Sequence, residues 1–150
     1  MTTVAPGNWS ARAVDRTELA AGTTPPVLAA IDDVRRSFAD DPVTAWPDGQ
    51  GGALVVMEEV DLGPTWTPGR AWLGFAISYL HPEADCYPHY LAAEVCRSDG
   101  VPLAVPFHPG QVFTEVPAVM VSRRSPRRSA ALDTPARKTL SVLTYIRTCP

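Results

Sequence analysis

Residues 72–97 read WLGFAISYLHPEADCYPHYLAAEVCR, and this stretch decides the predicted fold. Large apolar residues alternate with small ones over 72–80, which is the period of a half-buried strand. A similar alternation returns over 90–97. Between the two runs, Pro82 and Pro88 interrupt the ladder, because proline donates no backbone hydrogen bond and restricts the residue before it. The stretch therefore predicts an antiparallel strand pair, with the rest of the chain packed on its apolar face.

Two amphipathic helices are predicted on either side of this pair, and both begin with the same local signal. Thr24 precedes Pro25, and Thr134 precedes Pro135, so each helix has a hydroxyl N-cap and a proline at its first position. Apolar residues follow at helical spacing in both segments. The first stripe comprises Val27, Ile31, Val34 and Phe38, and the second comprises Leu140, Val142, Leu143 and Ile146.

Further strands are predicted over 53–62 and 117–122, separated from their neighbours by turn-rich segments. Residues 101–110 contain three prolines and predict an irregular loop. The expected fold is therefore α+β, with an N-terminal amphipathic helix, an antiparallel β-meander of three to four strands and a C-terminal helix. Residues 1–23 form a poorly defined N-terminal segment, whose first ten residues are expected to be loose, and 24–150 form one domain.

Composition narrows the cellular setting. With 150 residues and 45% hydrophobic content, the chain is large enough for one globular core. No apolar run approaches the roughly 20 residues of a membrane span, and no secretory signal is visible. Three cysteines cannot all pair within one chain. We therefore expect a cytoplasmic protein with reduced thiols and no membrane partner.

Three short motifs occur in a fixed order along the chain: Tyr87-Pro88, Phe107-His108-Pro109-Gly110 and Asp133-Thr134-Pro135-Ala136. Together with the helix–meander–helix order they resemble the ubiquitin-conjugating enzyme (UBC-like) family, in particular its divergent bacterial members. The resemblance spans about residues 24–147 and implies the UBC-like fold for 24–150. It also implies a role in a bacterial ubiquitin-like modification pathway.

One departure from the family pattern changes the expected activity. Active members carry a nucleophilic cysteine roughly ten residues after the His-Pro-Asn segment, whereas residues 118–124 contain none. Ser122, next to Val121, stands nearest that place, but a serine hydroxyl is a poor nucleophile without an adjacent base. Gly110 replaces the asparagine of that segment, and His108 is interpreted as bracing its loop. The resemblance thus implies a non-catalytic protein without a cofactor, whose partners are a ubiquitin-like protein or an activating enzyme.

Cysteine and histidine residues near the turn leave two alternatives open. Cys86 with His81 or His89 as base would suit an atypical cysteine-dependent conjugating enzyme or transferase. Two thiols and two imidazoles are also the ligand set of a structural zinc site, which would make the chain a zinc-stabilised binding module. The candidate zinc ligands are His81, Cys86, His89 and Cys96.

Positive charge is concentrated in one region. Residues 123–138 hold six of the thirteen basic residues and one acidic residue, although the net charge of the chain is −3. Such a cluster favours contact with an acidic protein surface. Nucleic acid is disfavoured because the rest of the chain is acidic and no aromatic residue lies among the arginines. The predicted partner-binding residues are Arg123, Arg124, Arg127 and Arg128.

Overall fold

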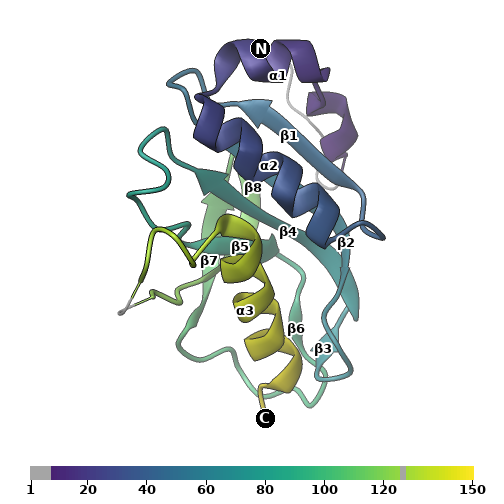
Figure 1. Ribbon diagram of the computed structural model, residues 1–150. Coiled ribbons are helices and arrows are strands. Elements are labelled where there is room, and N and C mark those ends of the chain that lie inside the picture. The colour runs from purple at the N-terminus through teal and green to yellow at the C-terminus, as the bar shows by residue number, and fades with distance from the viewer. Residues whose placement is uncertain (1–7, 126–127) are drawn as a thin grey trace.

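The computed structural model describes residues 8–125 and 128–150 (Figure 1). Its helical elements are the 3₁₀ helix η1 (Trp9–Arg12) and the α-helices α1 (Arg16–Gly22), α2 (Pro25–Ser37) and α3 (Pro135–Thr148). Its strands are β1 (Val43–Pro47), β2 (Ala53–Asp61), β3 (Trp66–Thr67), β4 (Arg70–Ile77), β5 (His89–Ala92), β6 (Cys96–Arg97), β7 (Phe107–Phe113) and β8 (Val116–Val121). None of the helices described is long and apolar enough to cross a membrane.

Six strands form one antiparallel sheet in the order β1-β2-β4-β5-β8-β7, and β3 and β6 form a second, two-stranded sheet. The pairing of β4 with β5 confirms the strand pair predicted from residues 72–97, with Leu73 opposite Leu91. The second predicted strand is divided, however. Cys96 and Arg97 leave the large sheet and pair with β3 instead.

Helices α2 and α3 lie on the same face of the large sheet (Figure 1). Both begin where the sequence predicts. The Thr24 hydroxyl accepts a hydrogen bond from the Val27 amide at 3.3 Å, and the Thr134 hydroxyl accepts one from the Arg137 amide at 3.2 Å. These N-caps satisfy amide groups that have no partner in the first helical turn.

The main core lies between these helices and the sheet. Its helical part contains Val27, Ile31, Val34, Val142, Leu143 and Ile146, and its sheet part includes Val55, Met57, Leu73, Phe75 and Ile77. Burying one such side chain contributes about 1.5–3 kcal/mol to stability. Leu140, expected on the apolar side of α3, is instead 51% exposed. The buried stripe of α3 runs through Lys138, Val142 and Ile146, four residues apart, so Leu140 faces away from it.

Aromatic side chains cover the opposite face of the sheet. Trp9 packs edge-on against Trp72 with ring centroids 4.9 Å apart, and Phe113 stacks on Tyr90 at 5.0 Å. A Cβ atom on Gly74 would lie 2.5 Å from the Phe113 ring, so only glycine permits this close approach. The expectation of a loose chain start is therefore wrong at Trp9, which is 1% exposed. Residues 1–7 lie outside the described part of the chain.

The predicted UBC-like arrangement, one N-terminal helix followed by a meander of three to four strands, is wrong. The structure has six strands in its main sheet, a second small sheet and two helical elements before α2. Two strands were not predicted, because proline, or proline followed by glycine, indicates a turn or loop. They are β1, which ends at Pro47, and β7, in which Pro109 and Gly110 lie at a register shift. Both are edge strands, where proline can be accommodated.

Candidate functional site

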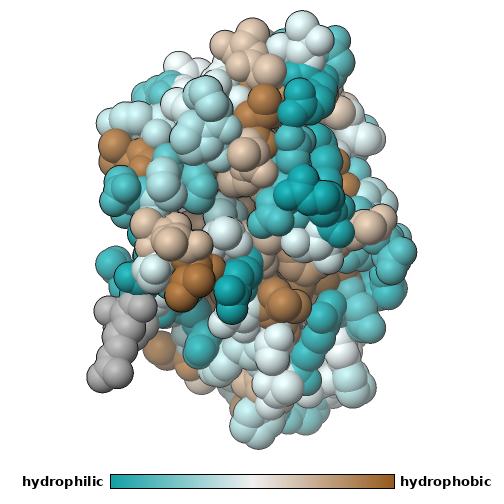
Figure 2. Space-filling view, in the orientation of Figure 1, coloured by the Kyte–Doolittle hydropathy of each residue, from teal (hydrophilic) through white to brown (hydrophobic). Residues whose placement is uncertain are grey.

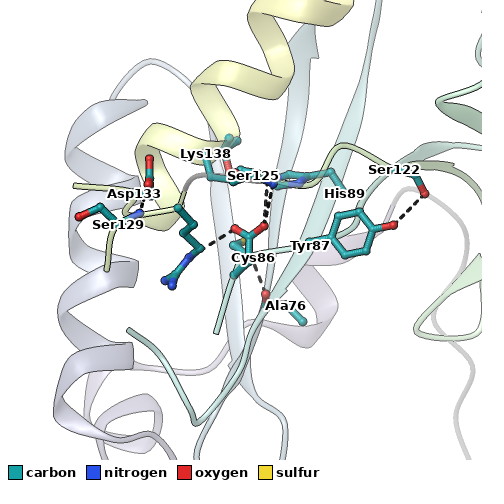
Figure 3. A network of polar contacts seen from close by, with 12 residues as sticks. Ala76, Cys86, Tyr87, His89, Ser122, Ser125, Ser129, Asp133 and Lys138 are labelled. Atoms are coloured by element: carbon teal, nitrogen blue, oxygen red, sulfur yellow. Dashed lines mark hydrogen bonds and ion pairs between the residues drawn. The ribbon is translucent and has the colours of Figure 1, made fainter. Parts of the chain in front are cut away.

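A carboxylate joins three separate segments next to the basic region. Asp85, in the loop between β4 and β5, accepts a hydrogen bond from the Lys138 ammonium on α3 at 3.0 Å. The Ser125 amide also donates to Asp85, at 3.4 Å, and the Arg128 guanidinium lies 3.7 Å from it (Figure 3). The Lys138 side chain is only 5% exposed. A buried ammonium requires such a partner, because desolvation of an unpaired charge is costly.

Arg128 strengthens the same junction through backbone groups. Its guanidinium donates to the carbonyl oxygens of Pro82 and of Glu83, the latter at 3.1 Å. The side chain is 15% exposed and is therefore used mainly within the molecule. We call Asp85, Ser125, Arg128 and Lys138 the anchor, because they fasten the segment after β8 to α3 and to the β4–β5 loop.

Ser125 and Lys138 could suggest a serine nucleophile with a lysine base, since their side chains are 2.5 Å apart. Such a lysine must be neutral to accept the serine proton. Here the Lys138 ammonium lies 3.0 Å from the Asp85 carboxylate, and an ammonium group donates hydrogen bonds but has no lone pair to accept a proton. The geometry therefore supports a structural contact.

Cys86 is buried directly beside the anchor. Its thiol donates to the Ala76 carbonyl oxygen at 3.6 Å, and the side chain is among the core residues (Figure 3). Burial raises the pKa of the Cys86 thiol, and the negative charge of Asp85 raises it further. The thiolate, which is the nucleophilic form, is therefore strongly disfavoured.

His89, one of the two candidate bases for Cys86, is also in the core. Its Nε2 atom is 2.9 Å from the Thr139 hydroxyl of α3, and its ring packs against Phe75 with centroids 5.0 Å apart. Burial lowers the pKa of His89 to about 3, with a smaller contribution from the charge of Lys138. The imidazole is thus neutral at physiological pH and connects β5 to α3.

The four candidate zinc ligands do not come together. Within residues 8–125 and 128–150, no group of three or more histidine, cysteine, aspartate or glutamate side chains is placed to hold a metal ion. Cys96 is exposed in the two-stranded sheet, where its thiol donates to the Thr67 carbonyl oxygen at 3.6 Å. His81 remains in the β4–β5 loop, while Cys86 and His89 make the core contacts described above.

Ser122 directly follows β8, and His108 lies within β7. The Ser122 hydroxyl accepts a hydrogen bond from the Tyr87 hydroxyl at 3.2 Å. His108 pairs with Met120 in the β7–β8 hairpin, so the segment 107–110, expected as an irregular loop, belongs to a strand. That hairpin is built on local pairing with a bulge at Pro109 and Gly110.

Arg123 and Arg124 lie over tyrosine rings. The Arg123 guanidinium carbon is 3.9 Å from the ring centroid of Tyr145, and that of Arg124 is 4.6 Å from the centroid of Tyr87. Hydrogen bonding with Ser122, and then with Arg124, lowers the pKa of Tyr87. Stacking orders the guanidinium groups while leaving their edges able to donate. Arg127, the remaining predicted partner-binding residue, lies outside the described residues.

Sequence reasoning missed Asp85, Ser125, Lys138 and Tyr145 as parts of this site. One signal was present: Lys138 lies four residues before Val142 on the apolar stripe of α3. A lysine on a buried stripe requires an acidic partner. The sequence did not indicate which of its sixteen acidic residues would supply it.

Comparison with protein-family models, curated proteins and solved structures finds no match to this chain.

Proposed function

We propose that this chain is a protein-binding domain without catalytic activity, whose Arg123 and Arg124 contact an acidic partner. One observation carries the proposal: both guanidinium groups are held over tyrosine rings. None of the ion pairs within the described residues uses either arginine. Two ordered cations outside those ion pairs suit carboxylates, and little side-chain entropy remains to be lost on binding.

The position of Cys86 supports a non-catalytic role. A transferase using this thiol needs an exposed thiolate, whereas Cys86 is 6% exposed and its pKa is raised by burial. Its neighbour His89 is engaged by Thr139 and is turned into the core.

The pathway is a separate part of the proposal. The order of Tyr87-Pro88, residues 107–110 and residues 133–136 supports a role in a bacterial ubiquitin-like modification pathway in the cytoplasm. The strand arrangement lends this part no support, since it differs from the UBC-like one. A ubiquitin-like protein or an activating enzyme is the proposed partner.

The absence of catalysis is tested by incubating the protein with an activating enzyme, a ubiquitin-like protein and ATP. We expect no thiol-reducible adduct on a non-reducing gel. An adduct that forms and disappears in Cys86→Ser would contradict the proposal and favour the cysteine-dependent transferase.

The binding surface is tested with a fluorescein-labelled peptide rich in glutamate, followed by fluorescence anisotropy. The double variant Arg123→Ser/Arg124→Ser should bind about tenfold more weakly, and added salt should weaken binding to the unmodified protein. Arg36→Ser/Arg70→Ser removes two other exposed arginines and is the matched control. Equal affinity of the two double variants would refute the assigned surface.

A further inference from the structure

A pocket of about 270 Å³ lies between residues 101–105 and the C-terminal end of α3. Trp66, Phe107 and Tyr145 form its aromatic wall. Its volume is below the roughly 300–1,000 Å³ of sites that hold drug-sized ligands. The pocket therefore has room for a single apolar side chain rather than for a cofactor.

The aromatic wall connects this pocket to the basic segment. Trp66 and Phe107 have ring centroids 4.8 Å apart, and Phe107 and Tyr145 stack at 6.1 Å. Arg123 covers the Tyr145 ring, and at the other end Arg97 lies 5.9 Å from the Trp66 centroid. The apolar wall thus leads directly to the Arg123 guanidinium.

A second, more open pocket of about 470 Å³ adjoins the first at Tyr145, which lines both. Arg123, Arg137 and Leu140 contribute to its walls, and no acidic side chain of the described residues lines either pocket. Leu140 is the apolar residue of α3 that the core does not use. On the face that carries α2 and α3, apolar side chains reach the surface in separate small patches surrounded by polar ones (Figure 2).

We infer that these two pockets together bind an extended acidic peptide, with an apolar side chain in the first pocket and a carboxylate on Arg123 and Arg137. This inference rests on the proposed function and specifies the partner. Charge complementarity supports it, because two arginines with no acidic side chain of the described residues beside them in the pocket lining favour planar carboxylates.

The spacing between the apolar and the acidic residue of the peptide follows from two distances between the groups that would bind them. The path from the Phe107 ring through Tyr145 to the Arg123 guanidinium is about 10 Å. An extended chain covers at most about 3.3–3.6 Å per residue, so the acidic residue should lie about three positions from the apolar one. Exposed Val101 and Val105, at 54% and 81%, stand at the rim of the first pocket, where the peptide would cover them.

A single-stranded nucleic acid is the competing ligand, and the observations favour the peptide. Base stacking needs exposed ring faces. Trp66 and Phe107 are only 3% and 5% exposed, and one face of Tyr145 is occupied by Arg123.

The test uses a fluorescein-labelled peptide with one leucine followed three residues later by two glutamates, the other positions being glycine and serine. In anisotropy titrations up to millimolar concentration, the full chain should bind it. Replacing the leucine by serine, or the glutamates by glutamines, should weaken binding about tenfold. Arg123→Ser/Arg137→Ser should have the same effect, with Arg36→Ser/Arg70→Ser as the charge-matched control.

A second variant tests the first pocket without disturbing the core. Ala104 is exposed on its rim, and Ala104→Trp should fill the pocket and abolish the advantage of the leucine peptide. Unchanged thermal unfolding of each variant shows that binding, not folding, is affected.

The outcomes separate this inference from the proposed function. If the serine peptide binds as tightly as the leucine peptide and still depends on Arg123 and Arg124, the proposed function stands and the inference is overturned. If neither peptide binds, both fail. An oligothymidylate that binds more tightly than the peptide, and loses affinity in the same arginine variant, would overturn the inference in favour of nucleic acid.

Discussion

The two ends of one arginine-rich segment have different roles. Arg128 donates to backbone carbonyls of the β4–β5 loop and pairs with Asp85, while Arg123 and Arg124 rest on tyrosine rings and pair with no acidic side chain among the described residues. The residue type is the same and the sequence separation is small. The side chains differ in what they contact. Arg128 donates hydrogen bonds to oxygen atoms, whereas Arg123 and Arg124 lie over aromatic rings. An arginine cluster therefore cannot be assigned one role as a whole.

The largest effect is expected from breaking the anchor at Lys138. Lys138→Ala leaves the Asp85 carboxylate without its ammonium partner and should lower the free energy of unfolding by about 3 kcal/mol in urea denaturation. The double variant Asp85→Asn/Lys138→Met removes both charges and should lose less. If the single and double variants are equally unstable, the ion pair does not hold the segment in place.

A pH-dependent effect is expected from His89, which lies beneath the anchor. Its pKa is about 3 in the folded protein, below the ordinary value near 6.5, so the unfolded chain binds the extra proton. The contribution of neutral His89 to the free energy of unfolding should be fully present above about pH 6.5. It should decrease as the pH falls towards 3, by up to about 1.4 kcal/mol per pH unit.

Urea denaturation at pH 7.5 and 5.5 measures this effect, and His89→Gln should reduce the difference between the two stabilities. His108→Gln is the control, since that residue lies in an edge strand. A variant as pH-sensitive as the unmodified protein would show that His89 is not responsible.

The smallest stability changes are expected from replacing one arginine at each end of the segment, which compares the two ends directly. Arg128→Ala removes hydrogen bonds to two carbonyl groups and should reduce stability by about 1–2 kcal/mol. Arg124→Ala, at an exposed position, should change it by less than about 0.5 kcal/mol. Equal losses in thermal or urea unfolding would mean that both ends are structural and would remove the distinction drawn above.

Local signals in the sequence determined the parts of the fold that depend on neighbouring residues. The Thr24-Pro25 and Thr134-Pro135 helix starts are correct because an N-cap and a proline act within one turn. The pairing of β4 with β5 is also correct, because alternation and an intervening turn favour adjacent antiparallel strands.

Only the tertiary structure decided the rest, because those features depend on contacts between residues far apart in the chain. Pro47 in β1, and Pro109 and Gly110 in β7, indicate turns unless the strands are known to lie at sheet edges. Lys138 and Asp85 are 53 residues apart, and no local pattern specifies which carboxylate a buried lysine will meet. The sequence determined that residues 123–128 are basic; packing against Tyr145, Tyr87 and the β4–β5 loop decided which arginines described here remain available to a partner.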